Sequence, residues 1–103
     1  MSDQMKVAIC GAGAWGTAMA IQCAQQGLVV SLLPRREEQA EAMRRTGENQ
    51  DYLPGYPLPK GLSVETSDEA ALSDASIVLL GSPSYALRLW LERIKKTITA
   101  DRR

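Results

Sequence analysis

The residues with the clearest chemical meaning form a glycine-rich segment near the amino terminus. It follows a short apolar run at 6–10 and precedes a segment with a helical pattern. In such a strand–turn–helix, the first glycine allows a tight turn, the second lets the backbone approach a phosphate, and the third lets the helix pack on the strand. The unpaired N–H groups at the start of the helix then face the anion. The spacing predicts a binding turn for a dinucleotide pyrophosphate, made by Gly11, Ala12, Gly13, Ala14, Trp15 and Gly16.

Two arginines, Arg35 and Arg36, follow the second apolar run at 29–33. In NAD-binding turns of this kind, an acidic residue about 20 positions beyond the glycines contacts the ribose hydroxyl groups. A guanidinium instead pairs with a phosphate through two hydrogen bonds and stacks on a base. The arginines therefore favour NADP as the cofactor, with NAD or the use of both left open. The alternative interpretation is a solvated start of the helix at 37–45.

Three individual residues fall where such a cofactor would lie. Trp15 stands at the mouth of the glycine turn, where its ring would form either a wall over the cofactor or a lid over the local core. Pro83 and Ser84 follow the last apolar run, at the carboxyl edge of the sheet where ligands of these folds bind. Ser84 is also a good helix N-cap, and the two roles are compatible.

The elements that must position these residues alternate along the chain. Buried strands are expected at 6–10, 29–33, 62–65 and 77–80, and helices at 14–26, 37–45, 68–72 and 85–98. Ser67 is expected to cap the third helix, and the prolines and glycines of 48–60 predict a loop. This order predicts an α/β, Rossmann-like doubly wound parallel sheet with strand order 3-2-1-4. The last helix has one apolar face, formed by Leu87, Trp90, Leu91, Ile94 and Ile98.

The chain length predicts one domain, 1–103, that is incomplete at its carboxyl end. A full dinucleotide-binding fold would add a fifth strand beside the fourth, and stopping here leaves an apolar edge unpaired. We therefore expect a chain cut before the later strands and before any substrate domain.

Composition narrows the classes of function. The formal net charge is +0, so no overall field attracts nucleic acid or an anionic membrane. The chain has no histidine, and its cysteines, Cys10 and Cys23, have no metal-ligand spacing. We expect two thiols in a reducing compartment, no metal site, no membrane span, and a cytoplasmic location.

Three segments together resemble one enzyme family. They are the run Gly-Ala-Gly-Ala-Trp-Gly-Thr-Ala at 11–18, Tyr52-Leu53-Pro54-Gly55 followed by Leu58-Pro59, and Pro83-Ser84-Tyr85-Ala86-Leu87-Arg88. In this order they are similar to the N-terminal domain of bacterial NAD(P)-dependent glycerol-3-phosphate dehydrogenases. Ala14 departs from the pattern, since many members have serine there.

The resemblance implies reversible hydride transfer between NAD(P)H and dihydroxyacetone phosphate, giving sn-glycerol 3-phosphate for phospholipid synthesis. It places Ala14 and Trp15 on the cofactor turn, Arg35 and Arg36 at the adenine-ribose phosphate, and Tyr52 at a weaker cofactor contact. It also implies a helical substrate domain, and a homodimer as a possible state of the complete protein.

The family's catalytic lysines have no counterpart in this chain. None of Lys6, Lys60, Lys95 and Lys96 matches their motifs, so no catalytic residue is assigned. Two rival functions stay open: a non-catalytic NAD(P)-sensing module, and another reductase of the ketopantoate or hydroxy-acid type. The Tyr-Leu-Pro-Gly motif argues against the second.

Overall fold

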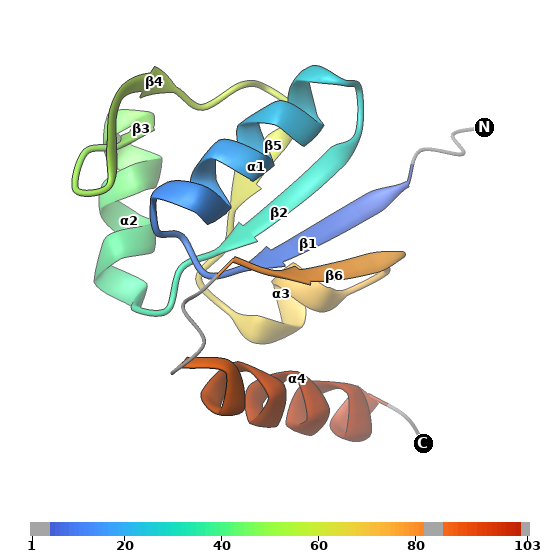
Figure 1. Ribbon diagram of the computed structural model, residues 1–103. Coiled ribbons are helices and arrows are strands. Elements are labelled where there is room, and N and C mark those ends of the chain that lie inside the picture. Colours follow the sequence, from blue (N-terminus) through green and yellow to red (C-terminus); the bar gives the residue numbers. More distant parts are fainter. Residues whose placement is uncertain (1–4, 82–85, 102–103) are drawn as a thin grey trace.

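A four-stranded parallel sheet forms the centre of the protein in this computed structural model, which describes residues 5–81 and 86–101. Its strands are β1 (Lys6–Cys10), β2 (Val29–Leu33), β5 (Leu62–Val64) and β6 (Ile77–Leu80). Their order across the sheet is β5-β2-β1-β6, with β1 paired to both β2 and β6. This confirms the predicted order 3-2-1-4. It also places the glycine turn after a central strand (Figure 1).

Helices cover both faces of the sheet (Figure 1). The helices α1 (Ala14–Gln25) and α2 (Glu37–Thr46) share one hydrophobic core with one face of β1 and β2. On the opposite face lie α3 (Asp68–Leu72) and α4 (Leu87–Asp101), which enclose a second, smaller core. The two cores follow from the alternation of side chains along each strand: Ile9 belongs to the first core and Cys10 to the second.

The helix ends follow the predicted signals. Gly27, two positions after the end of α1, and Gly47, directly after α2, adopt positive φ angles of 93° and 77°, a conformation that glycine adopts without strain. The Ser67 hydroxyl accepts a hydrogen bond from the Ala70 N–H at 3.1 Å and so caps α3, as expected.

The loop prediction for 48–60 was wrong in part. The strands β3 (Glu48–Asn49) and β4 (Leu53–Pro57) pair antiparallel as a small hairpin. Prolines are tolerated in β4 because it pairs on one side with β3, so the missing N–H groups interrupt no second ladder. Gly55 adopts a φ of +88°, and its N–H donates to the Glu48 carboxylate at 3.4 Å.

The predicted apolar face of α4 is only half buried. Trp90 is fully buried and Ile94 packs against the second core, whereas Leu87, Leu91 and Ile98 are exposed. The cause is the position of α4, which packs against α3. Arg93 forms an ion pair with Asp68 of α3 through its Nε at 3.1 Å, and it lies 4.2 Å from the centre of the Trp90 ring. The expected start of this helix, at Tyr85, lies outside the described residues.

Both cysteines are free thiols, as the sequence predicts. Cys10 ends β1 with no exposed surface. Burial raises the pKa of the Cys10 thiol from its ordinary value of 9.0 to about 11, while the nearby Arg93 lowers this pKa and Asp68 raises it. Because the buried thiol stays protonated, it is a packing group.

We predict that Cys10 makes the stability of the protein fall at high pH. The unfolded thiol releases its proton near its ordinary pKa of 9.0, whereas the folded thiol keeps it until about pH 11. The unfolded state therefore binds fewer protons in this window, and the free energy of unfolding decreases as pH rises through it. Urea unfolding at a pH below 9.0 and at a pH near 11 measures this decrease. The decrease should be smaller in Cys10→Ala and unchanged in the matched variant Cys23→Ala; equal slopes in all three proteins would contradict the assignment.

Candidate functional site

The turn after β1 brings three backbones into close contact. Gly11 has a φ of +107°, and its N–H donates to the Leu33 carbonyl at 2.8 Å, which ties the turn to the end of β2. A Cβ at Gly16 would stand 2.2 Å from the Gly11 carbonyl oxygen and 3.0 Å from that of Gly81. The predicted roles of Gly11 and Gly16 are therefore seen in the geometry: one makes the turn, and the other lets α1 touch the ends of β1 and β6.

Gly13 differs from the other two because it faces open space. A Cβ built there has no neighbour within 4 Å, and the φ of Gly13 is an ordinary −76°. Gly13 is the N-cap of α1, so it offers no side chain to the first-turn N–H groups, and this first turn holds no acidic residue. The amino end of α1, with its positive dipole end, thus has neither a side-chain cap nor an acidic residue in its own first turn.

A buried hydrogen-bond network holds the inner side of the turn. The Ala12 carbonyl accepts from Asn49 Nδ2 at 2.8 Å and from Gln39 Nε2 at 2.9 Å. Asn49 Nδ2 also donates to the Thr17 hydroxyl at 2.8 Å, and Asn49 Oδ1 accepts from the Tyr52 N–H at 3.3 Å. Sequence reasoning missed this network because its central residue lies in the segment expected to be a loop. A buried asparagine beside a turn carries no periodic signal.

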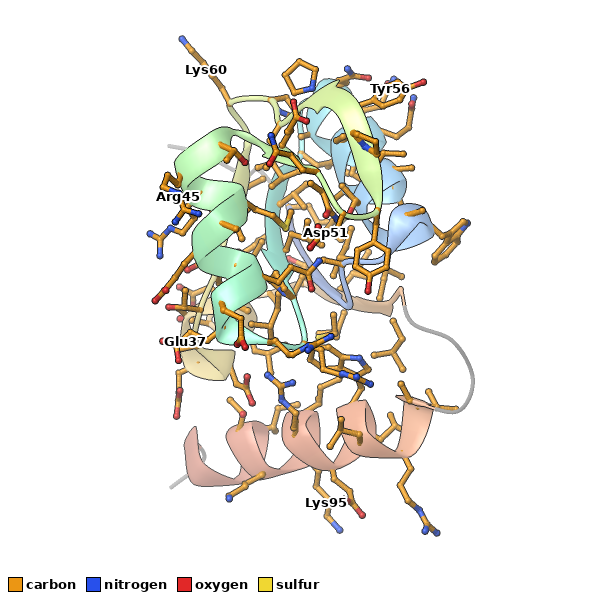
Figure 2. The ribbon with its side chains drawn as sticks, turned by 90° about the vertical axis from the view of Figure 1, so that its left-hand side faces the viewer. Glu37, Arg45, Asp51, Tyr56, Lys60 and Lys95 are labelled. Atoms are coloured by element: carbon orange, nitrogen blue, oxygen red, sulfur yellow. The ribbon has the colours of Figure 1, made fainter. Side chains whose placement is uncertain are left out.

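The two arginines stand at the carboxyl end of β2, directly before α2, and both are exposed. The Leu33 hydrogen bond brings this strand end next to the glycine turn, so the two predicted binding segments are neighbours. Figure 2 shows α2 with Glu37 in its first turn and Arg45 near its end, both pointing outward.

The aromatic candidates lie on the surface. Trp15 is 65% exposed in the first turn of α1, so its ring does not act as a lid over the core. Tyr52 is 51% exposed in the hairpin turn, and Asn49 connects its backbone to the glycine turn. Pro83 and Ser84 lie outside the described residues; Gly81, just before them, contacts Gly16.

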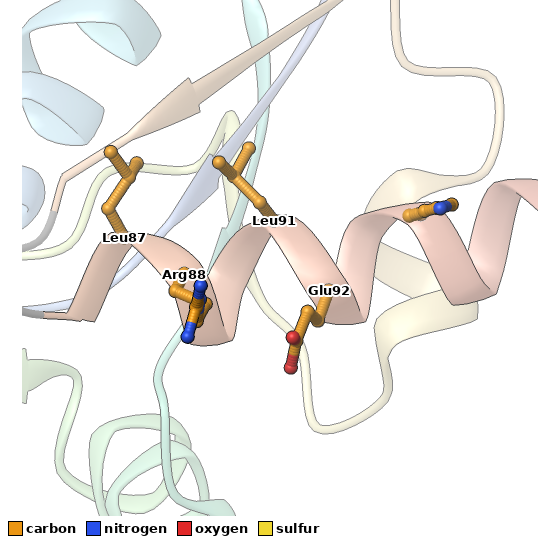
Figure 3. Close-up of a pocket in the computed structure, with 5 residues that line it drawn as sticks. Leu87, Arg88, Leu91 and Glu92 are labelled. Atoms are coloured by element: carbon orange, nitrogen blue, oxygen red, sulfur yellow. The ribbon is translucent and has the colours of Figure 1, made fainter.

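A second surface feature lies on α4, away from the glycine turn. It is a groove of about 460 Å³, lined by Leu87, Arg88, Leu91, Glu92 and Lys95. Leu87 and Leu91 point to one side of the helix in the close-up (Figure 3), and Lys95 points away from the rest of the protein (Figure 2). Because every lining residue belongs to one helix, the groove is an open surface, and its lining includes no side chain from a second element.

The described residues contain neither a candidate metal site nor a membrane-spanning helix. No three histidine, cysteine, aspartate or glutamate residues gather within 5–81 and 86–101 in a way that could hold a metal ion. Over the same residues, every helix is too short or too polar to cross a bilayer.

The sheet order and the glycine turn define the protein class: a Rossmann-type α/β domain. Comparisons then give the family. Residues 6–103 match the family model described as NAD-dependent glycerol-3-phosphate dehydrogenase N-terminus. The chain belongs to this family.

Relatives named glycerol-3-phosphate dehydrogenase [NAD(P)+] agree with this assignment. The protein of Corynebacterium glutamicum is 46% identical over 94% of this chain, and that of Thermus thermophilus is 49% identical over 82%. The crystal structure of the Coxiella burnetii glycerol-3-phosphate dehydrogenase superposes with a TM-score of 0.87 at 34% identity, over 91% of this chain. The chain spans 29%, 26% and 29% of these three proteins.

We predict that two alanine substitutions in the turn change the stability of the protein by different amounts. Gly16→Ala places a methyl group against the Gly11 carbonyl and forces α1 off the sheet, which should lower the free energy of unfolding by about 2 kcal/mol or more. Gly13→Ala meets open space and should change it by no more than about 1 kcal/mol. Urea unfolding compares the two variants. Equal losses would show that the close contact at Gly16 does not limit stability.

Proposed function

We propose that residues 1–103 form the cofactor-binding domain of a glycerol-3-phosphate dehydrogenase, with NADP as the favoured cofactor. The observation that carries the proposal is the contrast within one turn. Gly11 and Gly16 are packed tightly, while Gly13 faces open space at an amino end of α1 without a side-chain cap. A pyrophosphate needs this combination of a rigid frame, room for its oxygens and unpaired N–H groups.

The residues present fit a dinucleotide. The backbone of 11–16 would hold the pyrophosphate, and Arg35 and Arg36 would hold the 2′-phosphate of NADP. Trp15 and Tyr52 offer exposed rings beside the turn, and Pro83 and Ser84 follow the strand next to it. The bound nicotinamide would supply the hydride for the reaction. The chain's own part is to bind and orient it.

The choice between NADP and NAD depends on the charge at the end of β2. Both arginines are exposed and follow the strand end that is hydrogen-bonded to the turn, so we expect them to reach a phosphate on the adenine ribose. Glu37 and Glu38 lie in the first turn of α2, where their negative charges interact favourably with the positive end of the helix dipole. This arrangement supports NADPH over NADH.

We predict that the chain binds NADPH at least about tenfold more tightly than NADH, because a paired phosphate adds charge-assisted hydrogen bonds. Calorimetric titration measures both affinities. The double variant Arg35→Ala/Arg36→Ala should abolish the difference. The matched control is Arg44→Ala/Arg45→Ala at the other end of α2, which removes the same charge and should preserve it. Equal affinities for the two cofactors in the unmodified chain would overturn the NADP preference.

For the whole enzyme we propose reversible hydride transfer between NADPH and dihydroxyacetone phosphate. The names of the relatives support the reaction class, and the chain covers less than a third of their length. The groups that bind and protonate the substrate would then come from outside these residues. The proposal includes a cytoplasmic location, which the two free thiols support. It also includes a homodimer and no nucleic-acid partner.

The activity is tested by joining this chain to the part of the Corynebacterium glutamicum relative that follows the matched region. The chimera should oxidise NADPH when dihydroxyacetone phosphate is added, as followed by the nicotinamide absorbance. In the chimera, Gly13→Ala should raise the KM for NADPH at least about tenfold, because its methyl group occupies the space proposed for the phosphates. A folded chimera that binds NADPH without turnover would favour a non-catalytic sensing module.

A further inference from the structure

The Ala12 carbonyl group has an unusually complete set of partners. Its oxygen accepts one hydrogen bond from Asn49 Nδ2 and another from Gln39 Nε2, at 2.8 and 2.9 Å. A carbonyl oxygen has two lone pairs, so both are used. Asn49 is 1% exposed, and Ala12 is buried as well. The general pattern of a pyrophosphate turn requires neither side chain.

These bonds fix the direction of the peptide that links Ala12 to Gly13. A trans peptide is planar, so its C=O and N–H point in opposite directions. With the Ala12 carbonyl held toward α2 and the hairpin, the Gly13 N–H points away from them. If this peptide rotated, the carbonyl oxygen would take the place of the N–H and present negative charge to an anion.

Asn49 uses the rest of its amide group on two more segments. Its Nδ2 donates to the Thr17 hydroxyl in α1, and its Oδ1 accepts from the Tyr52 N–H in the hairpin turn. One buried side chain therefore connects the glycine turn, the first helix and the segment that carries Tyr52. These are three of the segments assigned to cofactor binding above.

We infer that Asn49 is a positioning residue for the dinucleotide: it holds the Ala12 carbonyl inward, so that the Gly13 N–H faces the pyrophosphate, and it keeps Tyr52 beside the same turn. This role rests on the proposed function, because it concerns the binding of that cofactor. Gln39 has the same role only at the Ala12 carbonyl, to which it donates one of the two hydrogen bonds.

The chemistry of the partners explains why an amide is needed here. The Ala12 carbonyl accepts only, so the group facing it must donate; the Tyr52 N–H donates only, so the group facing it must accept. Aspartate has nearly the same shape as asparagine but would place a carboxylate oxygen against the Ala12 carbonyl at 2.8 Å. Asn49→Asp therefore keeps the side-chain volume and replaces the donor that faces the Ala12 carbonyl with an acceptor.

The experiment measures binding of two ligands to the 103-residue chain. NADPH needs the glycine turn and the arginines, whereas adenosine 2′-monophosphate carries no pyrophosphate and reports on Arg35 and Arg36. Asn49→Ala and Asn49→Asp should weaken NADPH binding at least about tenfold, the expected cost of leaving a buried partner unpaired. Binding of adenosine 2′-monophosphate, followed by NMR titration, should stay within about twofold.

Two further variants keep the test decisive. Leu62→Ala removes buried side-chain volume from β5, so it should lower stability without separating the two affinities. Gln39→Ala affects a half-buried side chain and should weaken NADPH binding about threefold, since one bond to Ala12 remains; it carries the test if neither Asn49 variant folds. In each Asn49 or Gln39 variant that folds, the NMR signal of the Gly13 amide should shift even in the absence of ligand.

The outcomes separate the two proposals. If the unmodified chain binds neither ligand, the proposed function fails. If it binds both, and the Asn49 variants lose NADPH and adenosine 2′-monophosphate in parallel as Leu62→Ala does, Asn49 is a structural residue and the inference is overturned. Unchanged NADPH affinity in folded Asn49→Ala or Gln39→Ala overturns it as well.

Discussion

The approach of α1 to the sheet is the contact on which the rest of the structure depends. At Gly16 the helix backbone comes so close to the ends of β1 and β6 that a methyl group would overlap the Gly11 carbonyl. This contact sets where α1 begins and how its axis crosses the sheet. The uncapped amino end of the helix is therefore held above the carboxyl edges of the central strands, next to the end of β2. At Gly16 this contact is one of backbone against backbone, and the absence of a side chain there makes it possible.

The parts that could be predicted from sequence are those with a local or periodic signal. Continuous apolar runs at 6–10 and 29–33 indicated buried parallel strands, and both formed in register as neighbours. Gly47 and Ser67 marked helix ends through their own backbone or side-chain chemistry. The glycine spacing indicated both the turn and its close contact, because these requirements depend on residues only a few positions apart.

The parts that could not be predicted depend on tertiary position. The hairpin of β3 and β4 was missed because prolines usually exclude strands, and their tolerance there follows from pairing on one side. The sequence of α4 does have an apolar face, but the spacing of apolar residues cannot show which part of that face packs against another element. Contact with α3 buries Trp90 and leaves Leu87 exposed. For the candidate site, Asn49 was missed because the two groups to which its amide donates, the Ala12 carbonyl and the Thr17 hydroxyl, lie more than 30 positions away along the chain.

The position of β6 has a consequence for the order in which the protein opens. The strand β1 is paired on both sides and is almost fully buried, whereas β6 pairs with β1 alone within the described residues and is half buried. Amide protons exchange most readily from elements with few neighbours, so β6 belongs to the less protected layer of the fold. Yet Gly81, at the end of β6, forms part of the surface on which Gly16 rests. The rigidity of the glycine turn is therefore linked to the local unfolding equilibrium of β6.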